Sequence, residues 1–302
     1  MASYTATTRF MVISDTHDFK FGQAEKVGGK FCQPAPKCDV LLHCGDLTLD
    51  GDAESLKDSL RMLGSIKAEL KLVIAGNHDM TLDCKYWRGR YPKFPEDHEE
   101  AMKVMKEQGA TDAGITYLEE GLSSYTLKSG AKFTIYVSPY TPEYCGWAFP
   151  YERDQDRFNL AEKVTPGATS IAQTPIPDFP DVDIIMTHGP PKGIFDGTKS
   201  GLAGCDNLMR AISRAKPLMH CFGHIHEGYG AELVTWNEGK KLFGADAIQK
   251  ESVQKNSYPE ASKWPIKHGE ETLMVNAAIN NVNYRPVNSP WLIDLELQTW
   301  LS

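Results

Sequence analysis

The sequence predicts a layered α/β fold, and two observations support this prediction. Short runs rich in β-branched and other apolar residues recur along the chain, each ending at a turn-forming residue, as is typical of buried strands. Segments with apolar residues at helical spacing lie between several of these runs. Alternation of strands and helices favours sheets whose faces are covered by crossover helices.

The individual elements follow from these patterns in order along the chain. Eight strands are expected to be buried on both faces, because their apolar character is nearly continuous. They are predicted at residues 9–14, 39–44, 70–75, 132–138, 182–187, 218–223, 272–278 and 291–297. Amphipathic helices are predicted at residues 53–66, 96–109 and 205–216.

Three stretches fit neither pattern, and we expect them to be loops or excursions from the fold. Residues 19–37 are rich in glycine and lysine, residues 140–180 hold many prolines and aromatics, and residues 236–271 are polar. Loops of such length are often functional. No repeat or interdomain linker is evident, so we expect a single domain over residues 1–302.

Composition limits the classes of partner. The formal net charge of −8 over 302 residues disfavours nucleic acid, which is usually bound by an excess of lysine and arginine. The first residues, MASYTATTRF, lack an apolar signal-peptide core, and no apolar run approaches membrane-spanning length. The seven cysteines contain no CxxC pair, which is typical of reduced thiols. We therefore expect a cytoplasmic protein without a membrane partner.

Polar donor residues follow five of the predicted strands at the point where each strand ends. Ligands of α/β proteins are bound at the loops beyond the carboxyl ends of strands, so these side chains should converge if the strands are neighbours. They are Asp15 and His17, then Asp46, then Asn77 and His78, then His188, and finally His224 and His226.

Each of these motifs alone is also typical of a turn, because Asp, Asn and Gly favour tight turns. Their recurrence at successive strand ends favours a shared site, and five of the nine histidines lie there. His43 and His220 lie inside predicted strands and are expected to be core histidines. We assign no function to His98 or His268.

The donor types indicate a metal centre. Imidazole, carboxylate and amide donors without thiolate suit Mn²⁺, Fe²⁺ or Zn²⁺. Seven ligands from these eight side chains are too many for one catalytic ion with an open position, and they suit two ions that share a bridging carboxylate. Two ions roughly 3.5 to 4 Å apart stabilise the attacking and leaving oxygens of a displacement at phosphorus.

The motifs DTH, GD, GNHD, HGPP and GHIH, in this order, resemble the calcineurin-like metallophosphoesterase superfamily. The stretches HGPPKGIFD, FGHIHEGYG and VNAAINNVNYRPVNSPWLIDL are similar to its class III metallophosphodiesterase branch, which includes the metallophosphoesterase-domain-containing brain and fetal proteins. The resemblance covers residues 9–297 outside the three excursions. It implies a four-layer α-β-β-α sandwich with a dinuclear metal site at the strand ends.

The resemblance also implies a role for each donor. Asp46 would bridge the two metals together with a hydroxide, and His78 would face the phosphate and assist the leaving group. Asp79 has no role to carry over and is expected to form hydrogen bonds in the turn. The two metals would be held by Asp15, His17 and His226 and by Asn77, His188 and His224, respectively.

The expected function is a metal-dependent phosphodiesterase that hydrolyses a small diester of the cyclic-nucleotide or glycerophosphodiester type. A phosphomonoesterase or protein phosphatase could use the same metal core, but the sequence GDLTLDGD lacks the Asp-Arg-Gly typical of protein phosphatases. A nucleotide-binding regulator with low turnover is a third interpretation. A nuclease is disfavoured by the acidic composition.

Four residues are candidates for substrate contacts, each with an alternative interpretation. Tyr140 and Trp147, with Tyr144 and Phe149 in the same excursion, are predicted to stack on a base or line a leaving-group pocket. Alternatively, they pack the excursion onto the body of the protein. Lys192 and Arg285 are predicted to contact a phosphate, and alternatively they are solvated surface charges.

Overall fold

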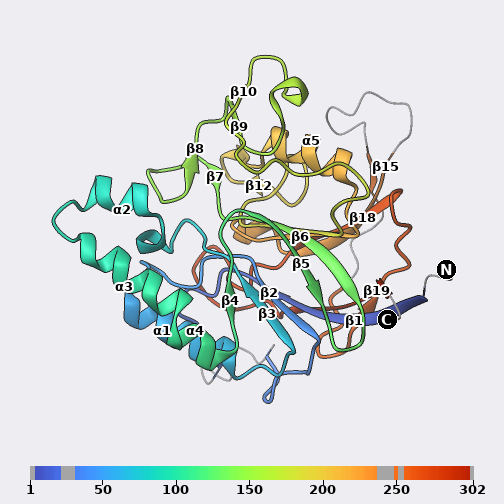
Figure 1. Ribbon diagram of the computed structural model, residues 1–302, viewed down its shortest axis with the longest axis horizontal. Coiled ribbons are helices and arrows are strands. Elements are labelled where there is room, and N and C mark those ends of the chain that lie inside the picture. Colours follow the sequence, from blue (N-terminus) through green and yellow to red (C-terminus); the bar gives the residue numbers. More distant parts are fainter. Residues whose placement is uncertain (1–3, 22–30, 237–247, 251–254, 300–302) are drawn as a thin grey trace.

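The computed structural model of the protein describes residues 4–21, 31–236, 248–250 and 255–299 (Figure 1). Two large sheets form its centre, with strand orders β17-β19-β1-β2-β3-β4 and β16-β15-β18-β14-β11-β6-β5. All eight predicted strands are present in these sheets. The two sheets and the helices outside them make up the layered α/β architecture that the sequence predicts.

The first sheet is parallel at its centre. Neighbouring strands β1, β2, β3 and β4 run parallel, and β19 pairs antiparallel with β1 over most of its length. The carboxyl ends of β1, β2, β3 and β4 therefore point to one edge of the sheet. The strands are β1 (Tyr4–Ile13), β2 (Val40–His43), β3 (Leu70–Val73), β4 (Thr116–Tyr117), β17 (Ser262–Lys263) and β19 (Trp291–Thr299).

The second sheet also has a parallel centre, formed by β6, β11, β14 and β18. The antiparallel strands β5 and β15 lie on either side of this centre. The strands are β5 (Gly121–Thr126), β6 (Lys132–Ser138), β11 (Ile184–Thr187), β14 (Met219–Phe222), β15 (Gly230–Trp236), β16 (Ile248–Lys250) and β18 (Glu271–Asn276).

Alternating side chains of β1 explain why the sheets have helices on only their outer faces. Phe10 and Val12 pack into the core between the two sheets, where the Phe10 and Phe133 rings lie 5.7 Å apart. Met11 and Ile13 point to the opposite face and pack into a second core. Successive side chains of a strand face opposite sides, so an apolar run with both faces covered fits a central layer.

The helices complete a four-layer α-β-β-α arrangement, as the family resemblance implies. Helices α1 (Ala53–Gly64), α3 (Pro95–Lys106) and α4 (Gln108–Ala113) cover the first sheet, and α5 (Asp206–Ala215) covers the second. Figure 1 shows α5 separated from the other three by the sheets. Helix α1 begins at the N-cap Asp52, whose carboxylate accepts hydrogen bonds from two backbone N–H groups of the first turn.

Some elements differ from the prediction. The segment 96–109 was expected to form one helix, but the backbone leaves the helical region at Glu107 and divides it into α3 and α4. Helix α2 (Cys84–Arg90) was not predicted, because none of its side chains is fully buried and only Tyr86 and Trp87 pack against the core. Strand β5, with the sequence GLSSYT, was missed because its residues are only partly buried or exposed.

The predicted excursion 140–180 lies outside the strands of the two central sheets, whereas 236–271, expected to be a loop, adds the short strands β16 and β17 to them. Residues 140–180 contain the two-residue strands β7 (Thr141–Pro142), β8 (Pro150–Tyr151), β9 (Gln155–Asp156) and β10 (Thr169–Ser170). The described ends of 19–37 are packed, since the buried Phe19 and Phe31 rings lie 4.6 Å apart. Residues 22–30, 237–247 and 251–254 lie outside the described residues. No helix in the described part of the chain is long and apolar enough to span a membrane.

Candidate metal centre

The two sheets are joined at the edge where the predicted donors lie. The N–H of Ser14, just after β1, donates to the carbonyl of Ala277 at 3.0 Å, and the Ser14 carbonyl accepts from Ile279 at 3.0 Å. Residues 277–279 follow β18 of the second sheet, so these bonds hold the carboxyl ends of both sheets together. Donors from five separate strands can therefore meet at one place.

A first group of donors consists of Asp15, His17 and His226. Their potential ligand atoms all lie within 4.8 Å of one another. The Nε2 atom of His226 lies 3.3 Å from Oδ1 of Asp15 and 3.2 Å from Nε2 of His17. Each Nδ1 faces a carbonyl at 3.1 Å, that of Thr48 for His17 and that of Asn281 for His226. The carbonyls assign the ring protons to Nδ1, which leaves both Nε2 atoms free to bind a cation.

A second group consists of Asp46, His188 and His224, with Asn77 beside them. The Nε2 atom of His188 lies 3.4 Å from Oδ1 of Asp46 and 2.9 Å from Oδ1 of Asn77. Its Nδ1 faces the Cys44 carbonyl at 2.9 Å, so this histidine is oriented in the same way as those of the first group.

Asp46 lies between the two groups. Its Oδ1 faces His188, and its Oδ2 lies 3.6 Å from Nε2 of His17. One carboxylate oxygen is thus directed to each group, which is the arrangement that a bridging ligand requires. The structure therefore brings all seven predicted ligands together, and their donor types fit divalent cations.

The charges in this cluster are mutually dependent. Burial opposes ionisation of Asp15, but the neighbouring His226 and His188 outweigh it and lower the pKa to about 2. Burial likewise opposes ionisation of Asp46, and His188 outweighs it, so the pKa of Asp46 lies well below its usual value. Burial also opposes the charge of His188, but Asp46 more than offsets it and raises the pKa to about 9. Both carboxylates are therefore ionised, as metal ligands must be.

Two further imidazoles of the cluster, those of His17 and His224, are held neutral, whereas Asp15 outweighs burial and raises the pKa of His226. Burial lowers the pKa of His17 to about 4 and that of His224 to about 3, against the opposing effect of the carboxylates. Neutral imidazole is the form that binds a metal ion. The neutral state of His17 and His224 matches the ligand roles predicted for them, whereas His188 must lose a proton to bind a cation.

His78 is in contact with the cluster but faces differently. Its backbone N–H donates to Oδ1 of Asp46 at 2.8 Å, and its ring is stacked on Trp147 at 4.1 Å. A ring nitrogen of His78 lies within 4.8 Å of donor atoms of His17 and Asp46, so distance alone would also admit it as a ligand. Its Nδ1 is hydrogen-bonded to the Leu49 carbonyl at 2.8 Å, as in the ligand histidines, but its ring is stacked on Trp147 and its Nε2 lies 3.5 Å from the Tyr284 hydroxyl at the open cavity. This position suits contact with a substrate.

Two further features hold the donor loops in place. The buried carboxylate of Asp79 accepts hydrogen bonds from the N–H groups of Gly76, Leu47 and Thr48 at 2.9 to 3.2 Å, which ties the loop after β3 to the loop after β2. This is the hydrogen-bonding use expected of Asp79. Gly223 allows close approach of the second sheet, because a Cβ there would lie 2.0 Å from Oδ2 of Asp15.

A cavity of about 550 Å³ opens over both donor groups. Trp147 lines it, whereas Tyr140, Lys192 and Arg285 are not among its lining residues. The Tyr140 ring instead lies 3.4 Å from the Arg157 guanidinium carbon, and the Lys192 ammonium donates to the Leu202 carbonyl at 3.3 Å. All four substrate contacts remain predictions.

Three lining residues carry chemistry that the sequence analysis missed. Arg153 and Lys199 place positive charge at the cavity, and Tyr284 places a phenol there. Lys199 lies in the turn of the hairpin formed by β12 (Gly197–Thr198) and β13 (Gly201–Leu202). No motif marks these residues, and only the folding of their loops over the strand ends could reveal them.

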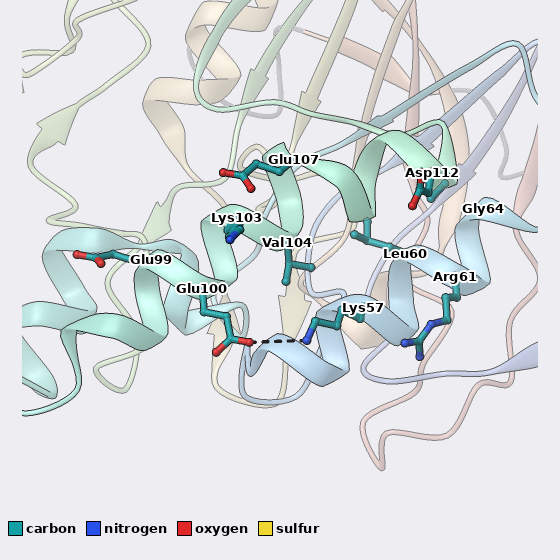
Figure 2. A pocket seen from close by; sticks show the side chains of 11 residues that line it. Lys57, Leu60, Arg61, Gly64, Glu99, Glu100, Lys103, Val104, Glu107 and Asp112 are labelled. Atoms are coloured by element: carbon teal, nitrogen blue, oxygen red, sulfur yellow. Dashed lines mark ion pairs between the residues drawn. The ribbon is translucent and has the colours of Figure 1, made fainter.

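A larger hollow, of about 930 Å³, lies between α1 and the α3–α4 pair (Figure 2). Leu60 and Val104 line it together with charged side chains, including the Lys57–Glu100 ion pair at 3.6 Å. No histidine or cysteine is among its described lining residues. Despite its smaller volume, the cavity at the strand ends is therefore the better candidate for the site.

The two strand histidines predicted to be structural are buried in the core. The Nε2 of His43 pairs with the Thr16 hydroxyl at 3.0 Å, and that of His220 pairs with the Thr187 hydroxyl at 2.9 Å. Burial lowers both pKa values to about 3, so both imidazoles are neutral.

Comparisons with known proteins agree with this geometry. The family model for calcineurin-like phosphoesterases matches residues 8–228, which include all of the predicted ligands. The metallophosphoesterase domain-containing protein 1 of Homo sapiens is 31% identical to this chain, and the match covers 95% of this chain and 71% of that protein. A UPF0046 protein of Caenorhabditis elegans is 32% identical over 74% of this chain and 52% of its own length.

Among solved structures, the phosphopantetheinyl hydrolase of Mycobacterium tuberculosis matches 96% of both chains, with a TM-score of 0.45 and 13% identity. That similarity is too low to bear on the activity. The family model matches well over half of the chain, and the matched residues include the two groups of candidate metal ligands. The chain belongs to the calcineurin-like phosphoesterase family and is a metal-dependent phosphoester hydrolase.

Proposed function

We propose that the protein is a dinuclear-metal-dependent phosphodiesterase that hydrolyses small phosphodiesters, of the cyclic-nucleotide or glycerophosphodiester type. The observation that carries this proposal is the position of Asp46, which directs one oxygen to each of two donor groups beneath a cavity. One cation would be held by Asp15, His17 and His226, and the other by Asn77, His188 and His224, with Asp46 shared.

The ligand residues would bind the metals, and His78 would transfer a proton. Two bound divalent cations, of Mn, Fe or Zn, would supply activation of the attacking water and neutralisation of the phosphate charge. The chain's own contribution is to orient the ligand imidazoles through the carbonyls of Thr48, Cys44 and Asn281. In its doubly protonated form, His78 would give the proton on Nε2 to the leaving oxygen, because the proton on Nδ1 is held by the Leu49 carbonyl.

The cavity favours a diester over a monoester. Its aromatic lining, Trp147, Tyr144 and Tyr284, offers apolar surface for a second ester group. The positive charge of Arg153 and Lys199 is the observation that favours the alternative, a phosphomonoesterase, since a monoester carries more negative charge at the same phosphorus. A nucleotide-binding regulator with low turnover is the other alternative, and the complete donor set argues against it.

The thiols and the composition of the chain bear on the cellular compartment and on the class of substrate. All seven cysteines are free, as expected for a reducing compartment. The net charge of −8 disfavours a nucleic-acid substrate. We therefore propose that a single-domain enzyme acts on a small molecule in the cytoplasm.

Hydrolysis of bis-p-nitrophenyl phosphate by chelator-stripped protein, before and after addition of Mn²⁺, tests this proposal. Metal-restored turnover that exceeds turnover of p-nitrophenyl phosphate is expected. The variants Asp46→Ala and Asn77→Ala should lose at least about 100-fold in activity, because each removes a ligand. Asn283→Ala, at an exposed position, is a matched control. Unchanged rates in either ligand variant would contradict the proposal.

The other outcomes of the same assay identify the alternatives. Activity on the monoester alone would favour a phosphomonoesterase. Activity on neither substrate, with two equivalents of metal measured in the protein, would favour the regulator.

A further inference from the structure

Tyr284 occupies an unexpected position in the candidate site. Its hydroxyl lies 3.5 Å from Nε2 of His78, and its ring meets the rings of His17 and His226 edge-on at 4.9 and 5.4 Å. It lines the cavity and is 48% exposed. The ring thus lies against the first donor group, while the hydroxyl reaches the one histidine that we do not assign to a metal.

The tautomer of His78 makes this contact chemically significant. Because the Leu49 carbonyl accepts from Nδ1 at 2.8 Å, the neutral ring carries its proton there. Nε2 is then the free nitrogen, and it is the atom that the Tyr284 hydroxyl approaches. A separation of 3.5 Å is at the outer limit of a hydrogen bond, and such contacts in ligand-free sites commonly shorten in the working complex.

The backbone holds Tyr284 in this position. Its φ of 53° is in the left-handed region, which residues with a side chain seldom adopt. The turn is fixed by Asn281, whose carbonyl accepts from the Tyr284 N–H at 2.9 Å and whose Oδ1 accepts from the N–H groups of Asn283 and Arg285. The same Asn281 carbonyl faces Nδ1 of His226 at 3.1 Å. One turn therefore orients both a proposed metal ligand and Tyr284, as is typical of strained backbone at functional sites.

We propose that Tyr284 is a positioning residue for His78. The Tyr284 hydroxyl pairs with Nε2 of His78 and holds the imidazole in line with the leaving oxygen of the substrate. This inference rests on the proposed phosphodiesterase function. It assigns a role to residues 283–286 (NYRP), where the sequence predicts only Arg285 as a substrate contact.

The hydroxyl can serve His78 throughout a proton transfer, because it is both a donor and an acceptor. When the ring is doubly protonated, so that Nε2 also carries a proton, the hydroxyl accepts from Nε2 until the leaving oxygen takes its place as acceptor. As the P–O bond breaks, the proton passes from Nε2 to that oxygen, and the hydroxyl then donates to the bare nitrogen. Solvent returns a proton to Nε2 after product release, so Tyr284 undergoes no net change.

The first test compares two diaryl phosphates of similar shape with different leaving groups. 4-Nitrophenolate leaves readily without a proton, whereas phenolate depends more on protonation. Tyr284→Phe keeps the ring contacts and removes only the hydroxyl. We expect kcat on diphenyl phosphate to fall about tenfold or more, and kcat on bis-p-nitrophenyl phosphate to fall less than about threefold. Tyr91→Phe, at a tyrosine outside the cavity, is the control, and metal content should be unchanged in both variants.

The second test does not require turnover. In protein labelled with ¹⁵N-histidine, the Nε2 resonance of His78, assigned with His78→Gln, should move in Tyr284→Phe and not in Tyr91→Phe. An unmoved resonance, or an equal fall in rate on both diesters, would overturn the proposal. If the parent protein hydrolyses no diester, the phosphodiesterase function fails, and the resonance alone decides whether Tyr284 positions His78.

Discussion

The substitution Gly76→Ala should remove the metal centre through a single methyl group. Gly76 lies between the end of β3 and the proposed ligand Asn77. A Cβ at this position would lie 2.3 Å from Oδ1 of Asp46, 2.4 Å from its backbone nitrogen and 2.7 Å from Cε1 of His188. Ordinary contact with a Cβ begins at 3.4 Å, so the nearest atoms must move by about 1 Å.

The required displacement is large compared with the tolerance of a metal site. Metal–ligand distances are held within about 0.2 Å, so a shift of about 1 Å in the Asp46 carboxylate removes its bond to at least one cation. The clash involves backbone as well as side chain, and it pushes against His188 of the second sheet as well as Asp46 of the first. We expect the affinity for Mn²⁺ and the turnover of bis-p-nitrophenyl phosphate to fall at least about 100-fold.

Stability should fall less than metal binding. Overpacking typically costs about 1–3 kcal/mol, which corresponds to roughly 5 °C in the Tm of a protein of this size. Metal content by mass spectrometry after dialysis and the Tm of the metal-free protein measure the two effects. The control is Gly89→Ala in α2, where no atom lies within 4 Å of the added Cβ. Two equivalents of tightly bound metal and normal turnover in Gly76→Ala would refute the reasoning.

Four further predictions follow from the site. His188 has a pKa of about 9 because Asp46 outweighs burial, so it is protonated near neutral pH in the metal-free protein. Cation binding should therefore release about one proton, and the affinity for the cation should rise as the pH rises toward 9. Calorimetry in buffers of different ionisation enthalpy measures the proton release. Removing the metals should lower the Tm measurably, since ligand bound at about 1,000 times Kd contributes about 4 kcal/mol to stability. Thr48→Val removes a buried hydroxyl that donates to Asp79 at 2.8 Å, and urea unfolding should show a loss of about 1–3 kcal/mol. Arg153→Gln should raise KM about tenfold for diesters that carry a second anionic group, and leave KM for bis-p-nitrophenyl phosphate unchanged.

Each of these predictions has an outcome that contradicts it. Binding of Mn²⁺ without proton release would mean that His188 is not a ligand or is already neutral. A Tm insensitive to chelator would mean that the native protein binds no metal tightly. A stability loss in Thr126→Val, at an exposed strand position, equal to that in Thr48→Val would remove the special role of the buried hydroxyl. Equal KM changes for both kinds of diester would exclude Arg153 as a contact for a distal anion.

The strands and the proposed ligands could be predicted from the sequence because both depend on local patterns. A strand such as β11, with every residue buried, must be a short apolar run whichever neighbours it has. The donors follow such strands directly, so the convergence of His188 with Asp46 required only that parallel strands end at one edge.

The cavity wall could not be predicted, because nearness along the chain does not indicate nearness in space. Lys192 and Arg285 were chosen because they stand beside recognised motifs. The structure instead lines the cavity with Arg153 and Lys199, from loops that fold back over the strand ends. Tyr284 was missed for a related reason, since its approach to His78 depends on a left-handed backbone conformation that no sequence pattern signals.

The distribution of the proposed ligands links metal binding to the assembly of the fold. Asp15, Asp46 and Asn77 extend from the first sheet, whereas His188 and His224 extend from the second, so neither sheet alone can supply a complete site. Cations bound between them would oppose separation of the sheets as well as activate a substrate. In the metal-free protein, the attraction between the Asp46 carboxylate and the protonated His188 takes over part of this role, because it also joins one sheet to the other. Gradual metal loss should therefore weaken the contact between the sheets at the active-site edge, while the apolar core between Phe10 and Phe133 keeps them together.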